Sequence, residues 1–95
     1  MAAKKTDQLI PLCHSIPLSY VNVDLAPNIE ESSVKIIAEA SLDGKTGVEM
    51  EALTAVSIAG LTIYDMCKAI DREMILTNIK LIYKSGGKSG EFNAV

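Results

Sequence analysis

Two charged residues stand out in the stretch LTIYDMCKAI, residues 61–70, because they follow a long run without charge. Asp65 and Lys68 are three positions apart, and no charged residue lies between Glu51 and Asp65. On a helix, this spacing brings a carboxylate and an ammonium group within contact distance. Such a pair suits general acid–base catalysis, although structural ion pairs with the same spacing are common. The pair is therefore a candidate catalytic site that needs further support.

The only histidine, His14, lies in a loop-like stretch between Pro11 and Pro17. A lone loop histidine is more often a hydrogen-bonded structural residue than a catalytic one. Cys13 precedes it, but Cys13, His14 and Cys67 do not have zinc-ligand spacing. A thiol nucleophile would also need a base oriented by a third group. We interpret both cysteines as reduced thiols of an intracellular protein.

The stretch GVEME places Glu49 and Glu51 two positions apart at the start of an apolar segment. If the backbone is still extended there, both carboxylates point to one side, which suits binding a guanine-like edge or shuttling a proton. If the helix has already begun, the two residues supply the negative charge that stabilises a helix N-terminus, and this interpretation is favoured by sequence alone.

The glycine-rich stretch KSGGKSG, which begins at Lys84 and includes Lys88, resembles a phosphate-binding loop but is not a Walker A motif. The first glycine of that motif would fall on Ile82, and no helix follows. Exposed backbone N–H groups between the two lysines could still bind an anion. A solvated tail is the alternative.

The composition indicates one small domain, residues 1–95, with a modest core. Hydrophobic residues make up 48% of the chain but aromatic residues only 4%, so contact between subunits would help to stabilise it. The net charge of -3 argues against general nucleic-acid binding. The uncharged run 52–64 is too short to span a bilayer. We therefore expect a cytoplasmic protein that binds neither nucleic acid nor membrane.

The hydrophobic pattern predicts an α+β fold. Residues 18–25 alternate between apolar and polar side chains, as in a half-buried strand, and residues 33–42 are expected to pair back antiparallel. One long helix is predicted over 50–70 and a last strand over 75–84, while residues 1–9 resemble the end of a helix. This order matches a ferredoxin-like antiparallel sheet that has lost its first strand, with helices on one face.

The long helix is expected to have two buried faces, because it is apolar nearly all round. At 100° per residue, one face packs on the sheet, with Leu53, Val56, Gly60, Ile63, Tyr64 and Cys67. The opposite face carries Glu51, Thr54, Ala55, Ile58, Leu61, Thr62, Asp65 and Lys68. One small domain cannot cover both, so the second face is predicted to contact another subunit.

Taken together, LIPLCH, GKTGVEMEALTAVSIAGLTIYDMCKA and KSGGKSGEF strongly resemble the cyclic pyranopterin monophosphate synthase family, also called molybdenum cofactor biosynthesis protein C. The resemblance runs along the whole chain. It implies an enzyme, a lyase that converts (8S)-3′,8-cyclo-7,8-dihydroguanosine 5′-triphosphate to cyclic pyranopterin monophosphate and releases diphosphate. It also implies a homohexamer, built as a trimer of dimers with ferredoxin-like topology.

The resemblance assigns roles residue by residue. Asp65 falls on the family's catalytic aspartate and Lys68 on its active-site lysine. The chemistry needs repeated proton transfer, which His14 could also supply. The substrate-binding positions are Leu12, Cys13, His14, Glu49, Met50, Glu51, Lys84 and, as a further cation for the triphosphate, Lys88. No cofactor and no protein metal site are expected, although Mg²⁺ could accompany the substrate phosphates.

The sequence departs from the family pattern in two places. The family usually reads LCHP, whereas Ser15 follows His14 here. The family also carries a further N-terminal segment with another active-site lysine, so we expect a short form whose own activity is in question. A non-catalytic oligomeric domain that binds a nucleotide or pterin is the alternative function. Product formation from the cyclised nucleotide by chains with and without the upstream segment would separate the two.

The assigned residues also predict that the site is shared between subunits. Glu51 and Asp65 are fourteen positions apart on one predicted helix, or roughly 21 Å. A compact substrate cannot easily contact both ends of such a rod. Antiparallel packing of two helices across a two-fold axis would bring the two residues together.

Overall fold

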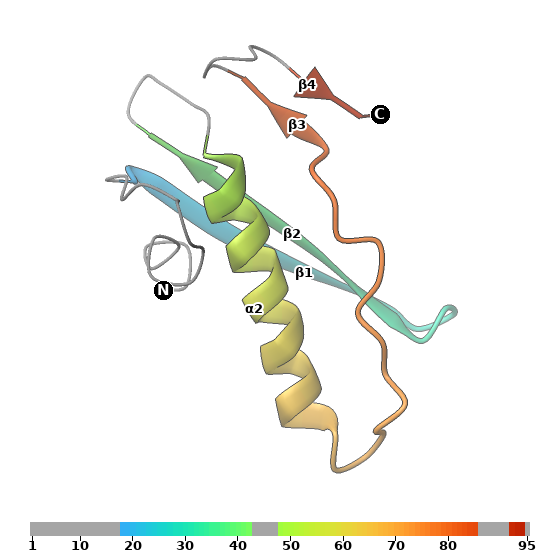
Figure 1. The fold of residues 1–95 in the computed structure, drawn as a ribbon. Coiled ribbons are helices and arrows are strands. Elements are labelled where there is room, and N and C mark those ends of the chain that lie inside the picture. Colours follow the sequence, from blue (N-terminus) through green and yellow to red (C-terminus); the bar gives the residue numbers. More distant parts are fainter. Residues whose placement is uncertain (1–17, 43–47, 86–91, 95) are drawn as a thin grey trace.

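The computed structural model describes residues 18–42, 48–85 and 92–94. The elements follow in the order β1 (Tyr20–Asn28), β2 (Ser33–Ser41), α2 (Glu49–Cys67), β3 (Tyr83–Lys84) and β4 (Phe92–Asn93). Helix α2 lies across one face of the β1–β2 hairpin, and the segment after it returns alongside the helix (Figure 1). The α+β class predicted from sequence is therefore confirmed.

Strands β1 and β2 form the predicted antiparallel hairpin, in a register that runs from Tyr20↔Ser41 to Asn28↔Ser33. The turn is fixed by Asn28, whose side-chain oxygen accepts the Glu31 backbone N–H at 3.1 Å while its amide donates to the Glu31 carboxylate at 2.9 Å. Ser32 completes the turn with a φ of 50°. An asparagine that bonds the backbone of its own turn is a typical reversal signal.

The predicted alternation of side chains decides which face of the hairpin is covered. Ile36 approaches α2 at Gly60, and the register places Leu25 beside Ile36 and Val23 beside Ala38 on the same face. Helix α2 contacts β2 far more than β1. Leu25 therefore stays 54% exposed although it points to the helix side. The prediction of a half-buried strand is right about the faces but overstates how well β1 is covered.

Helix α2 ends three residues before its predicted end at residue 70. The Lys68 N–H still donates to the Tyr64 carbonyl at 2.8 Å, as in a regular helix. After that, the N–H groups of Ile70 and Asp71 both donate to the carbonyl of Cys67, which tightens the chain into a turn. The Asp71 carboxylate then accepts the Glu73 N–H at 2.8 Å, an alternative to further helix.

The predicted division of α2 into a core face and a subunit-facing face is wrong for its N-terminal half. Glu51, Thr54 and Ala55 were placed opposite the core, yet all three are buried within this chain. Toward the C-terminus the same face is open, with Leu61 and Asp65 exposed. Angular position around a helix predicts which residues share a face, but it does not predict how far along the helix the fold covers that face.

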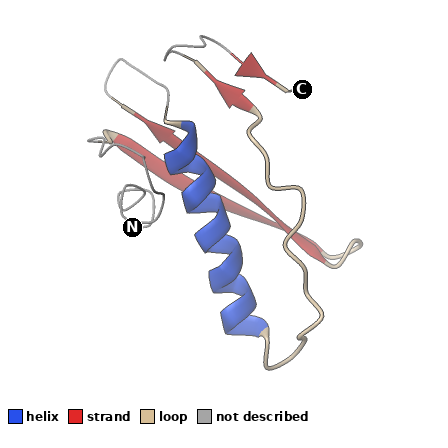
Figure 2. Cartoon of the chain, viewed as in Figure 1, coloured by secondary structure: helices blue, strands red, loops and turns tan. Residues whose placement is uncertain are grey.

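The predicted strand over residues 75–84 is mostly wrong. Only Tyr83–Lys84 pairs, with Phe92–Asn93, while residues 75–82 form a loop (Figure 2). Asn78 has a φ of 56°, a left-handed conformation that interrupts an extended run. The described strands therefore form two separate two-stranded sheets, and a single ferredoxin-like sheet is not observed among them.

By length and composition, helix α2 is apolar enough to cross a membrane. The prediction that this segment is too short to span a bilayer considered only the uncharged residues 52–64, whereas the whole helix is longer. One such helix is weak evidence for a span, since a core helix of a soluble protein passes the same test. Here α2 packs along β2 and carries the buried Glu51 near its start, so we interpret it as part of the packed fold.

Candidate active site

Asp65 and Lys68 form the contact predicted from their spacing. The Nζ of Lys68, the cap residue directly after α2, lies 2.9 Å from the Oδ1 of Asp65 in the last turn of the helix. The two side chains are 73% and 53% exposed, with Lys68 the less exposed. An exposed ion pair contributes little to folding stability. The pair is accessible to a ligand, and it presents a proton acceptor and a proton donor side by side.

A second pair joins two other candidate residues that are distant in sequence. The Lys84 Nζ on β3 lies 3.6 Å from the Glu49 Oε2, at the first turn of α2. The Lys84 side chain is only 11% exposed. The start of the helix and the C-terminal segment therefore meet, and they place an ammonium group beside a carboxylate in a largely desolvated position.

One oxygen of the Glu49 carboxylate accepts no hydrogen bond. Its Oε2 atom is buried without a hydrogen-bond partner, because 3.6 Å to Lys84 is beyond hydrogen-bond length. A buried acceptor without a donor is unfavourable. The positive end of the helix dipole partly offsets this cost at the first turn.

The alternative in which Glu49 and Glu51 point to the same side of an extended segment is wrong. Both lie within α2, where a separation of two residues turns the side chains to nearly opposite sides. Glu51 is buried with 3% of its surface exposed, whereas Glu49 is half-buried and Met50 exposed. Glu49 and Met50 are therefore the accessible members of this stretch.

These candidate residues form two clusters at opposite ends of one helix. Glu49 and Asp65 are sixteen positions apart in α2. At about 1.5 Å per residue, this separation is roughly 24 Å. Lys84 joins the cluster at the start of the helix and Lys68 the cluster at its end (Figure 1).

Several predicted site residues lie outside the part of the chain that the structure describes: Leu12, Cys13, His14 and Lys88. Most of the glycine-rich stretch after Lys84 lies outside it as well. Cys67 is described, and it is a free, exposed thiol.

Sequence reasoning missed the contact that Tyr64 makes. This residue was assigned to the core, yet its hydroxyl donates a hydrogen bond to the Arg72 carbonyl at 2.9 Å. The contact lies next to Asp65 and spans the turn that follows the helix. No local motif marks it, because the turn that creates it depends on how the chain reverses after Cys67.

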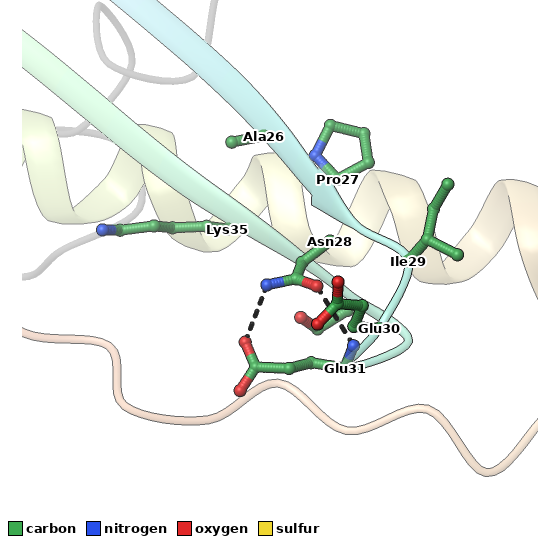
Figure 3. Close-up of a pocket in the computed structure, with 8 residues that line it drawn as sticks. Ala26, Pro27, Asn28, Ile29, Glu30, Glu31 and Lys35 are labelled. Carbon is green, nitrogen blue, oxygen red and sulfur yellow. Dashed lines mark hydrogen bonds between the residues drawn. The ribbon is translucent and has the colours of Figure 1, made fainter.

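Two other features of the described residues do not contribute to this site. No group of three or more histidine, cysteine, aspartate or glutamate side chains is placed to hold a metal there. An open depression lies at the hairpin turn, where Asn28 and Glu31 bond to each other (Figure 3). It is lined by residues 26–31, 33 and 35, so it contains none of the candidate residues.

Comparison with known proteins gives the family. The MoaC family model matches residues 1–87. Cyclic pyranopterin monophosphate synthase of Clostridium acetobutylicum is 57% identical over 95 residues, which are 100% of this chain and 59% of that protein. The protein of that name from Desulfatibacillum aliphaticivorans is 60% identical over 92 residues, 97% of this chain and 58% of that protein. The Arabidopsis thaliana relative, a cyclic pyranopterin monophosphate synthase named as mitochondrial, is 59% identical to this chain over 91 residues, which are 96% of this chain and 34% of that protein.

The bacterial comparisons also give the extent of the match. The chain spans somewhat more than half the length of these curated relatives. The family match nevertheless covers nearly all of its own residues, including every candidate residue except Lys88. The chain therefore belongs to the MoaC family.

Proposed function

We propose that this chain acts in molybdenum cofactor biosynthesis as part of a cyclic pyranopterin monophosphate synthase. The reaction is the conversion of (8S)-3′,8-cyclo-7,8-dihydroguanosine 5′-triphosphate to cyclic pyranopterin monophosphate with release of diphosphate. The shared name of its relatives supports this assignment. The observation that carries it is the contact of Lys84 with Glu49, because it joins two stretches that the family resemblance assigns to one site.

The proposed roles follow from the chemistry of each cluster. Asp65 and Lys68 exchange protons with the ring system while carbon–nitrogen bonds open and close. The Glu49 side chain, which is 32% exposed, accepts a hydrogen bond from the substrate, and Lys84 neutralises negative charge beside it. For His14, Leu12, Cys13 and Lys88 we keep the roles that the resemblance implies, as proton donor or substrate contacts.

A single site requires both clusters, and we propose that two subunits supply them. The roughly 24 Å between Glu49 and Asp65 is too long for one compact substrate. Antiparallel packing of two α2 helices would place the end of the helix that carries Glu49 in one chain beside the end that carries Asp65 in the other. The open C-terminal half of α2, with Leu61 55% exposed, supports such packing. We further propose the hexamer of three dimers and the ferredoxin-like topology of the family.

Complementation tests the shared site directly. Inactive Glu49→Gln and inactive Asp65→Asn chains are mixed in equal amounts, unfolded and reassembled. Random pairing should restore roughly a quarter of wild-type activity, because half the dimers are mixed and each mixed dimer has one intact site. No recovery, with mixed assemblies confirmed by native mass spectrometry, would refute the shared site. Substrate binding without turnover by the wild-type protein would instead favour a non-catalytic binding domain.

The location and the metal requirement are separate proposals. We propose a cytoplasmic protein, while noting that one relative is named as mitochondrial. We also propose that the reaction needs no resident cofactor. Fractionation of the native host cell would test the location. Turnover measured after exhaustive chelation, with and without added Mg²⁺, would test the metal requirement.

A further inference from the structure

One residue, Tyr64, makes hydrogen bonds at both ends of the turn that follows α2. The backbone carbonyl of Tyr64 accepts the Lys68 N–H at 2.8 Å, and the Tyr64 hydroxyl donates to the Arg72 carbonyl at 2.9 Å. The first bond is an ordinary helical one. The second is a side-chain bond that closes the segment 68–72 back onto the last turns of the helix. Lys68 therefore begins a short loop whose far end is held by the residue that precedes Asp65.

A second bond stiffens the same turn from within. The Asp71 carboxylate accepts the Glu73 N–H at 2.8 Å, beside the carbonyl that Tyr64 binds. No regular secondary structure follows Cys67 until Tyr83 within this described stretch. Without these side-chain bonds, the backbone from Lys68 onward would have few fixed partners, and its conformational freedom would be larger.

We propose that Tyr64 is a positioning residue for the Asp65–Lys68 pair, an inference that rests on the proposed function. Its hydroxyl holds the turn that follows Lys68, and so it limits fraying of the end of the helix, where both side chains of the pair are attached. Both members of the pair are more than half exposed, so surrounding side chains do little to hold them. If a catalytic side chain has much conformational freedom, the reaction rate falls, because fewer encounters with the substrate have the productive geometry.

The test compares Tyr64→Phe with wild type in steady-state turnover of the cyclised nucleotide. The phenylalanine keeps the ring and removes only the hydroxyl. We expect kcat to fall about tenfold. KM should stay within about twofold, because substrate contacts are unchanged. Tyr20→Phe, at an exposed tyrosine on β1, is the matched control and should change neither constant. Sedimentation should show the same assembly for all three proteins.

Asp71 supplies an independent check through the same turn. Asp71→Ala should lower kcat in the same way, and Asp71→Asn should restore it because the amide oxygen can still accept the Glu73 N–H. The double variant Tyr64→Phe/Asp71→Ala should lose less than the product of the single losses, since both act on one element.

Three outcomes would overturn the proposal: a normal kcat in Tyr64→Phe, a loss expressed only in KM, or a loss of assembly together with activity. Asp65→Asn separates this failure from failure of the proposed function. If Asp65→Asn is inactive while Tyr64→Phe is normal, only the positioning role is wrong. If Asp65→Asn keeps full turnover, the acid–base role itself is wrong.

Discussion

The close approach of α2 to the segment after it gives a sharp prediction at Gly60. A Cβ added there would lie 2.7 Å from Leu76 Cδ2 and 3.2 Å from its Cγ, and 3.8 Å from Ile36 Cδ1. Carbon atoms in good contact are about 3.5–4.0 Å apart, so Leu76 would have to move by roughly 1 Å. The contact with Ile36 is ordinary. Gly60→Ala therefore tests one contact, between the helix and a single side chain.

Two effects of opposite sign determine how much Gly60→Ala changes the free energy of unfolding. Replacing glycine with alanine inside a helix stabilises it by about 1 kcal/mol. Forcing an extra methyl group against packed atoms costs about 1–3 kcal/mol. Leu76 is 40% exposed and can partly move aside, so we take a cost near the middle of that range, about 2 kcal/mol. The net expectation is a destabilisation of about 1 kcal/mol in the wild-type background.

The sign should reverse when Leu76 is shortened. In a Leu76→Ala background the overlap is gone, and Gly60→Ala should stabilise by about 1 kcal/mol. The coupling between the two positions is then about 2 kcal/mol. Urea denaturation followed by circular dichroism measures all four free energies of unfolding. Protein concentration must be fixed, since assembly contributes to apparent stability.

Ala59→Gly is the matched control on the same helix. It should lower the free energy of unfolding by about 1 kcal/mol in both backgrounds, because only helix propensity changes. If Gly60→Ala stabilises equally with and without Leu76, the reasoning is refuted. The segment around Leu76 would then not pack against the helix in solution as it does in this structure.

Three further predictions follow from other contacts. Lys68→Ala should reduce turnover by more than about a hundredfold while sedimentation shows unchanged assembly, and near-normal turnover would contradict its role. Lys84→Met should lower the free energy of unfolding by about 1–2 kcal/mol, because it leaves the Glu49 carboxylate without its cation. The double variant Lys84→Met/Glu49→Gln should lose less free energy of unfolding than the sum of the two single losses, because the two residues form one pair. If urea denaturation shows that the two losses simply add, the pairing is contradicted. Leu61→Glu should weaken self-association in analytical ultracentrifugation, whereas Ile29→Glu at the exposed hairpin tip should not, and equal effects would contradict the proposed interface.

The elements that could be predicted are those encoded by local patterns. The hairpin follows from strict alternation around Val23 and from the turn chemistry of Asn28. The helix follows from its long apolar spacing. Contact between Asp65 and Lys68 also follows from spacing alone, and the structure confirms it at 2.9 Å.

What could not be predicted depends on contacts between distant parts of the chain. The burial of Glu51 depends on how far the fold covers the helix, which its angular position does not indicate. The stretch 75–82 has strand-like residues, but a strand also needs a partner, and the left-handed backbone at Asn78 breaks its extension. The contact of Lys84 with Glu49 has no local signal, because only the return of the chain along α2 creates it.

That last contact also has a consequence for the order of folding. The β1–β2 hairpin and the packing of α2 on β2 join neighbouring parts of the chain, and such local contacts form early and at low entropic cost. The contact of Lys84 with Glu49 closes a loop that contains the whole of α2 and the segment behind it, so we expect it to form late. Substitutions at these two residues should then accelerate unfolding and leave the refolding rate nearly unchanged. The part of the molecule that gathers candidate substrate contacts would be the last to assemble and the first to open.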